Sequence, residues 1–94
     1  MRQSAHWMKR EDDRILEYLD GEYWSTPSLI ATGAFEQVSA GHVEERLLFL
    51  QHAGLVERMH GNMYEITSEG RRYLEGELDA SHQPTPTVER VLRG

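Results

Sequence analysis

Hydrogen-bonding side chains gather in two short stretches of this 94-residue chain, residues 39–46 and residues 58–62. In the first stretch, Ser39 and Gly41 are small enough to let a ligand backbone approach closely. Arg46 carries a guanidinium whose geometry fits a phosphate or the edge of a guanine. A helix that began at Ser39 would add its own backbone N–H groups, which hold phosphate oxygens. These residue types therefore indicate contact with phosphates and base edges.

The full set of candidate contact residues comprises Ser39, Gly41, His42, Glu45 and Arg46 in the first stretch and Arg58, His60 and Asn62 in the second. Structural roles stay open for both arginines. Arg46 could pair with Glu44 or Glu45 on the same helix. Arg58 could face Glu65 across a hairpin, and pairs of this kind contribute about 0.2–1 kcal/mol to a sheet.

Apolar spacing and capping signals predict the elements that must position these residues. Thr26 followed by Pro27 is a helix start, and Ser39 and Thr67 are further N-cap residues. The predicted helices are 11–20, 27–33, 39 to about 53, and one that follows Thr67 and extends to Leu78. In the third of these, Val43, Leu47 and Leu50 form an inward stripe.

Residues 55–60 and 63–66 are predicted to form a β-hairpin around Gly61-Asn62, a dipeptide suited to a type I′ or II′ turn. A two-residue turn would place Arg58 opposite Glu65 and Met59 opposite Tyr64. It would also place four side chains on the core face: Leu55, Met59, Tyr64 and Ile66. The order of helix, hairpin and helix predicts an α+β fold of the winged helix-turn-helix type. Its parts are a three-helix core, a β-hairpin wing and a C-terminal helix.

The ends of the chain differ from its centre in composition. Residues 79–87 contain Pro84, Pro86 and small polar residues, so residues 79–94 are predicted to be a flexible C-terminal tail. Residues 88–92 are either disordered or a small helix that docks on a partner subunit. Arg2, Lys9, Arg10 and Arg14 make the N-terminal segment the most basic part. They are either an arm that contacts a nucleic-acid backbone or a solvated face that counters nearby acids.

The charge balance argues against a strongly basic nucleic-acid footprint. Sixteen Asp and Glu face ten Lys and Arg, which gives a formal net charge of -6, and Lys9 is the single lysine. Phosphate neutralisation normally supplies most non-specific affinity for DNA, so the acidic excess weakens the case for a DNA-binding protein without removing it. Acid excess with few lysines is typical of proteins from salt-loving archaea, although a GC-rich genome would also favour arginine.

Several function classes find no support in the residues. The five histidines (His6, His42, His52, His60 and His82) form no chelating pair, and there is no cysteine, so neither a metal site nor a cofactor is expected. No nucleophile and base pattern indicates an enzyme. No apolar run approaches the roughly 20 residues of a membrane span, and a cytoplasmic location is expected.

The residues of the second half resemble a known family. Gly54-Leu55-Val56-Glu57-Arg58 and Tyr64-Glu65-Ile66-Thr67-Ser68-Glu69-Gly70 are similar to the wing strands and following helix of many winged-helix regulators. The opening Trp7-Met8 with Asp12-Asp13-Arg14-Ile15-Leu16-Glu17 resembles small haloarchaeal proteins grouped with the phage phi-H repressor. The resemblance covers residues 7–78, which it implies are a winged-helix DNA-binding domain. One departure is the ten-residue spacing of Gly33 and Val43, which predicts a longer turn than a tight helix-turn-helix has.

The residues and the resemblance together predict a sequence-specific DNA-binding transcriptional regulator, a repressor, whose partner is double-stranded DNA. A homodimer is expected because one module with few basic residues would bind weakly, and Leu48, Phe49 and residues 88–92 are candidate partner surfaces. The alternative is a winged-helix module that binds protein, favoured by the acidic charge and by Glu44-Glu45 on the third helix. A regulator with a small-molecule pocket is a third hypothesis.

Overall fold

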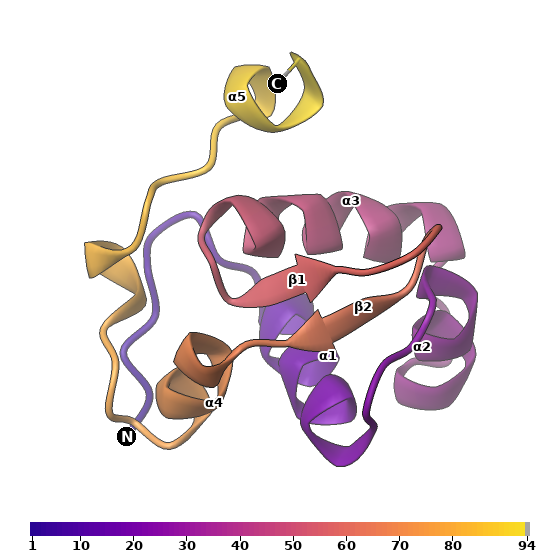
Figure 1. Cartoon of the computed structure of the whole chain (residues 1–94), viewed down its shortest axis with the longest axis horizontal. Coiled ribbons are helices and arrows are strands. Elements are labelled where there is room, and N and C mark those ends of the chain that lie inside the picture. Colours follow the sequence, from indigo (N-terminus) through magenta and orange to yellow (C-terminus); the bar gives the residue numbers. More distant parts are fainter. Residues whose placement is uncertain (94) are drawn as a thin grey trace.

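The computed structural model describes residues 1–93, with side chains through residue 92, so Gly94 at the end of the predicted tail lies outside the described residues. The elements follow in the order α1 (Arg10–Gly21), α2 (Pro27–Ala34), α3 (Ala40–His52), β1 (Val56–Arg58), β2 (Tyr64–Ile66), α4 (Ser68–Leu74), the 3-10 turn η1 (Ala80–His82) and α5 (Val88–Arg93). Three helices, a hairpin wing and a following helix make this an α+β winged-helix fold, as the sequence predicts (Figure 1).

All three predicted N-caps are confirmed. The hydroxyl oxygen of Thr26 accepts from the backbone N–H of Leu29 at 3.2 Å. Ser39 and Thr67 make the same bond, over 3.1 Å and 3.0 Å, to the N–H groups three residues further on. A cap satisfies an N–H that the helix itself leaves unpaired, which is why these short polar signals locate helix starts from local sequence.

The core lies where α1, α3 and the wing meet. The predicted stripe of α3 is fully buried, and it packs on Ile15, Leu16 and Leu19 of α1. Tyr64 and Ile66 of β2 and Tyr73 of α4 complete the core. β2 and α4 lie below α3 in Figure 1. Packing of one apolar face from each element therefore holds the wing against the helices.

The hairpin register differs from the prediction by one residue. Arg58 lies opposite Tyr64, and Glu57 rather than Arg58 lies opposite Glu65. The loop consists of the three residues 60–62, and Gly61 within it has a φ of 62°. Among the described residues, only glycines have a positive φ. Val56 is thereby buried on the core face at 2% exposure, whereas Met59 is 37% exposed. The predicted register would have turned Val56 to solvent, and burial of this β-branched side chain decides between the two.

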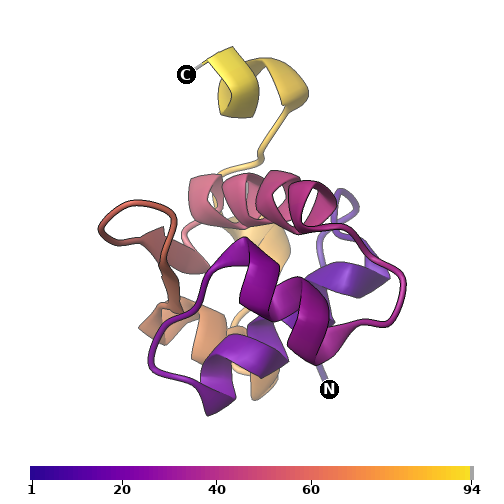
Figure 2. The ribbon, with the colours of Figure 1, turned by 90° about the vertical axis from the view of Figure 1, so that its right-hand side faces the viewer.

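A single bridge adds a third strand-like segment to the wing. Ser25, in the link between α1 and α2, exchanges two backbone hydrogen bonds with Tyr64, of 2.9 Å and 2.8 Å. This bridge fixes the start of α2 beside the wing. Figure 2 shows the result, with the wing on one side of α2 and the start of α1 on the other.

The N-terminal segment and the segment after α4 contact the core. Gln3 and Asp79 form a parallel bridge, and Ala5 and Ala80 are buried. The amide of Gln83 donates to the carbonyl of Ala53 at 3.0 Å. The packed region thus extends past residues 7 and 78 at both ends, and the flexibility of the tail stays a prediction. Beyond this point the chain leads to α5, which lies over α3 and away from the rest (Figure 1). No helix among the described residues has the length and apolar character needed to cross a bilayer.

Candidate nucleic-acid interface

The loop between α2 and α3 is long for a helix-turn-helix. α2 ends at Ala34 and α3 begins at Ala40, so five residues separate the helices, where a tight motif has about three or four. This agrees with the longer turn that the sequence predicts. Phe35 and Val38 in this loop are half-buried against the core and hold the loop in place.

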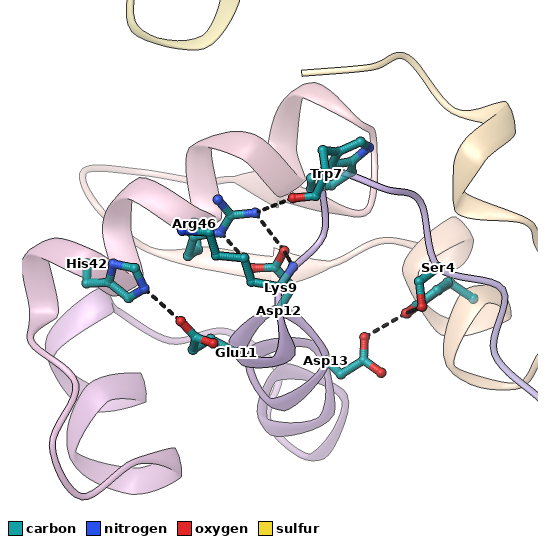
Figure 3. Close-up of polar contacts among 9 residues, drawn as sticks. Ser4, Trp7, Lys9, Glu11, Asp12, Asp13, His42 and Arg46 are labelled. Atoms are coloured by element: carbon teal, nitrogen blue, oxygen red, sulfur yellow. Dashed lines mark hydrogen bonds and ion pairs between the residues drawn. The ribbon is translucent and has the colours of Figure 1, made fainter. Parts of the chain in front are cut away.

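Arg46 is not available to a ligand, which corrects the prediction that it contacts DNA. Its side chain is 3% exposed, and its Nε and Nη2 atoms donate to the two carboxylate oxygens of Asp12 at 2.9 Å and 2.8 Å. Nη2 also donates to the carbonyl of Trp7 at 3.3 Å, and the guanidinium lies 4.6 Å from the ring centre of Phe49 (Figure 3). The alternative partners Glu44 and Glu45 are wrong as well, because both point to solvent.

His42 connects the start of α3 to the start of α1. Its Nε2 lies 3.0 Å from Oε2 of Glu11, and both side chains are about one-third exposed, at 33% and 30% (Figure 3). The hydrogen bond from His42 holds the pKa of Glu11 below its ordinary value. The pair leaves part of the imidazole accessible and fixes the orientation of α3 relative to α1.

The outward face of α3 carries small and acidic residues. Gly41, Glu44 and Glu45 are exposed, and so is the capping residue Ser39. With Arg46 buried, α3 presents no exposed arginine or lysine between Ala40 and His52. Any attraction of α3 for phosphate therefore has to come from its backbone N–H groups and His42, or from cations on neighbouring elements.

Arg58 supplies a cation on the side of the wing that faces α3. Its Nε donates to the carbonyl of Gly61 at 2.7 Å, and its guanidinium lies 5.9 Å from the ring centre of Tyr64. Burial raises the pKa of Tyr64, while the charge of Arg58 lowers it and that of Glu44 raises it, so both charges act on this ring. The predicted pairing of Arg58 with Glu65 is wrong, since the register places Tyr64 opposite Arg58.

His60 and Asn62 lie in the loop of the wing, and both are exposed. Neither side chain makes a hydrogen bond or ion pair with another described residue. The wing and the start of α3 thus offer two groups of accessible polar residues. They comprise Ser39, Gly41, His42 and Glu45 on α3 and Arg58, His60 and Asn62 on the wing.

Comparison with known proteins now identifies the fold family. The model of the winged helix-turn-helix phage repressor family matches residues 1–83. The chain belongs to this family. Among solved structures, it is similar to the PhiH1 repressor-like protein from Haloarcula marismortui, with 36% sequence identity and a TM-score of 0.84. That match covers 92% of this chain and 98% of the other. A search of curated proteins gives no match.

The sequence did not show that the basic residues near the N-terminus have different roles in this domain. Arg2 donates to Asp13, Glu17 and the carbonyl of Leu74, so it is a structural residue. Arg10 and Arg14 instead line an open groove of 540 Å³ beside the loop between α2 and α3. Arg2, Lys9, Arg10 and Arg14 look alike in the sequence, and only their partners in the fold show which of them are structural and which are accessible.

No group of three or more His, Asp or Glu side chains in residues 1–92 is arranged to hold a metal ion.

Proposed function

We propose that this protein is a sequence-specific transcriptional regulator that binds double-stranded DNA as a repressor in the cytoplasm. Membership of the phage repressor family supports the class of function. The residues proposed to contact DNA are Ser39, Gly41, His42 and Glu45 at the start of α3 and Arg58, His60 and Asn62 on the wing. The halophilic origin that the composition predicts stays a prediction.

The observation that carries the proposal is the placement of the free wing residues beside α3. A recognition helix lies in the major groove, with its N-terminal residues at the base edges. The loop of the wing, which contains His60 and Asn62, lies at the same end of the molecule as α2 and the start of α3 (Figure 1). In such a complex the wing would lie along the backbone next to the groove that α3 enters.

Each proposed contact has a chemical counterpart on DNA. Glu45 can accept from the amino group of cytosine. His42, whose Nε2 is bonded to Glu11, can accept from a base edge through Nδ1 when neutral and can donate to a base edge or a phosphate from Nδ1 when protonated. Small residues at Ser39 and Gly41 let the helix start approach the backbone closely. Arg58 is held by the carbonyl of Gly61 with nitrogen atoms left over for a phosphate.

We further propose that the protein binds as a homodimer, because a single module with so few free cations would hold DNA weakly. Two-fold pairing doubles the contacts and matches a palindromic site. The apolar residues Val88 and Leu92 of α5 are 63% and 56% exposed and are the proposed surface for the second copy. Phe49, which the sequence also suggested, is buried against Trp7 and Arg46.

The test is binding of the purified protein to genomic fragments, including its own upstream region, across a KCl series from 0.05 M to molar salt. We expect site-selective binding, and we expect the double variant Arg58→Gln with His60→Ala to weaken it about tenfold or more, as the loss of two polar contacts would. The matched control is Arg72→Gln with His82→Ala, which removes the same residue types from α4 and η1. Equal effects of the two doubles would contradict the assigned wing surface.

A second candidate function is a module that binds another protein. The exposed Glu44 and Glu45 on α3 favour it, and so do Tyr23 and Trp24, which are 90% and 51% exposed beside the wing. The same titration separates the two functions, because a folded protein that binds no fragment selectively at any salt would support the protein-binding module.

A further inference from the structure

The start of α1 carries three cations without a carboxylate partner. Lys9, Arg10 and Arg14 are all exposed, and we refer to them as the α1 patch. Arg10 makes no hydrogen bond or ion pair with the described residues, and Lys9 makes no ion pair. Arg14 donates one bond, of 3.1 Å, to the carbonyl of Ala34. A guanidinium with one bond to a neutral carbonyl keeps most of its donors for an anion.

Two of the three acids next in the chain have cationic partners elsewhere in the fold. Asp12 is fully buried on Arg46, and Asp13 accepts from Arg2 and from the hydroxyl of Tyr73. Glu11 is engaged with His42 (Figure 3). Asp12 and Asp13 thus face partners elsewhere in the fold, and Glu11 is the one of these acids that also interacts with the patch, through the charge of Lys9.

The two exposed arginines of α4 lie among acids. Arg71 pairs with Asp20 at 3.2 Å. Arg72 follows Glu69 by less than one turn of α4 and donates to the backbone of Glu77. In a protein of net charge -6, the α1 patch thus gathers three exposed cations, none of which forms an ion pair with a carboxylate among the described residues.

The patch lies next to the start of the proposed reading helix. The 540 Å³ groove lies between α1 and the loop that leads into α3, and it is lined by Arg10, Glu11, Arg14, Ala34, Phe35, Glu36 and Val38. Glu36 is the one acid of this groove without a partner among residues 1–92. The bond of His42 to Glu11 holds the start of α3 against the start of α1.

The wing and the α1 patch lie on opposite sides of α2 and α3. Figure 2 shows the wing on one side of these helices and the start of α1 on the other. Because the outward face of α3 is acidic, a duplex that α3 enters must be held by cations at its flanks. Arg58 supplies a cation at one flank, and the α1 patch supplies three at the other.

We infer that Lys9, Arg10 and Arg14 bind backbone phosphates of double-stranded DNA on the side of α3 opposite the wing. This inference rests on the proposed function and adds a contact surface that the proposed function does not include. Phosphate contacts position a protein on DNA and carry little sequence information. The patch therefore supplies affinity and orientation, and α3 with the wing supplies selectivity.

The test compares two double variants that remove equal charge. Arg10→Gln with Arg14→Gln alters the patch, and Arg71→Gln with Arg72→Gln alters α4, where one guanidinium also bonds only to a backbone carbonyl. Binding to a selected site and to unrelated duplex is measured from 0.05 M to 0.5 M KCl. Removal of two phosphate contacts should lower the slope of log K against log salt by about 1.8 and weaken both duplexes alike. The α4 variant should leave the slope unchanged.

Equal slopes for the two variants, or loss of selectivity without a change of slope, would overturn the inference. If Arg14→Gln disturbs folding, Lys9→Gln with Arg10→Gln replaces it, because neither side chain makes an ion pair in the structure. Failure of the unaltered protein to bind any duplex would instead overturn the proposed function and this inference together. A protein that binds DNA and depends on Arg58 but not on the patch overturns the inference alone.

Discussion

At the scale of the residue, the buried pair of Arg46 and Asp12 determines how α1 and α3 pack. Both carboxylate oxygens and two nitrogen atoms of the guanidinium are used, and neither side chain is more than 3% exposed. Burial of two charges costs desolvation that only good geometry repays, so the pair specifies one arrangement of the helices more than it adds stability. Every buried side-chain nitrogen and oxygen atom of the described residues has a hydrogen-bond partner, including those of this pair.

Removing one member of this pair should be severe. Arg46→Ala leaves the Asp12 carboxylate buried and alone, and the free energy of unfolding should fall by about 3–5 kcal/mol. The measurement is urea denaturation followed by circular dichroism. Arg71→Ala is the control, because its pair with Asp20 is about half exposed, at 55% and 49%, and should contribute about 0–1 kcal/mol. Similar losses in both variants would contradict the structural role of Arg46.

Tyr73 should make stability depend on alkaline pH. Burial, together with the 2.6 Å hydrogen bond that its hydroxyl donates to Asp13, raises the pKa of Tyr73 to about 12. The folded state therefore holds this proton more tightly than the unfolded chain, whose tyrosines have a pKa of about 10. The resulting stabilisation is complete below pH 10 and is lost as the pH rises through 12.

We expect the free energy of unfolding to fall by roughly 2–3 kcal/mol between pH 10 and 12, as a raised pKa of this size implies. Urea denaturation at each pH measures it. Tyr73→Phe should remove most of the fall, and the remainder comes from Tyr64, whose pKa burial also raises. An unchanged pH profile in the phenylalanine variant would show that another group is responsible.

At the scale of the element, α4 packs on the wing through a glycine. A Cβ on Gly70 would collide with the carbonyl oxygen of Leu55 and lie 2.6 Å from Cγ1 of Ile66. The carbonyl belongs to the backbone at the start of the wing and cannot turn aside. Gly70 therefore sets how closely α4 approaches the hairpin, and through it the position of the wing.

Two glycine substitutions should have opposite signs. Gly70→Ala should destabilise the protein by about 2–3 kcal/mol, the upper part of the range for overpacked cores. Gly41→Ala, on the exposed start of α3, meets only Ser39 Oγ at 4.0 Å and should stabilise by up to about 1 kcal/mol through helix propensity. Thermal unfolding of both variants measures the difference. A stable Gly70→Ala protein would mean that α4 can move away from the wing at little cost.

At the scale of the whole molecule, residues 1–6 and 79–86 complete the core. The N–H of Ala80 donates to the carbonyl of Gln3 at 2.9 Å, and Ala80 and Pro86 are buried. The two segments lie beside each other along one edge of the molecule, on the left in Figure 1. The domain therefore depends on chain that lies outside the three helices and the wing.

Truncation should separate the packed part of the tail from α5. A chain that stops after Leu78 loses the bonds of Ala80 and Gln83 and should be less stable by about 2–4 kcal/mol, from two hydrogen bonds and the apolar area they cover. A chain that stops after Thr87 keeps both bonds and should lose less than about 1 kcal/mol, since surface changes are small. Urea denaturation measures both. Equal stability of the two truncated chains would contradict a structural role for residues 79–86.

The chain that stops after Thr87 also tests whether α5 mediates dimerisation. If α5 supplies the surface for a second copy, the chain that stops after Thr87 should sediment as a monomer at concentrations where the full chain is a dimer. Because its monomer fold is otherwise intact, weaker DNA binding by this variant would follow from lost pairing. An unchanged dimer would place the interface elsewhere.

The sequence alone determined the elements and their order. N-caps at Thr26, Ser39 and Thr67, the apolar stripe of α3 and the glycine of the wing loop are local signals, and local energies decide them. Capping bonds span three residues, and helical stripes repeat every three or four residues, so a short window of sequence contains the whole interaction. The fold class followed because few arrangements bury those stripes together.

Tertiary structure decided what each polar residue does. Arg46 and Asp12 are 34 residues apart, and nothing local tells an arginine on a helix that its partner lies on another helix. The wing register depended on whether Val56 or Met59 reached the core, which only packing settles. Arg2 differs from Lys9, Arg10 and Arg14 because it forms ion pairs with Asp13 and Glu17 in the folded chain. Partners distant in sequence compete for each charge, and the fold selects among them because buried charges must be paired.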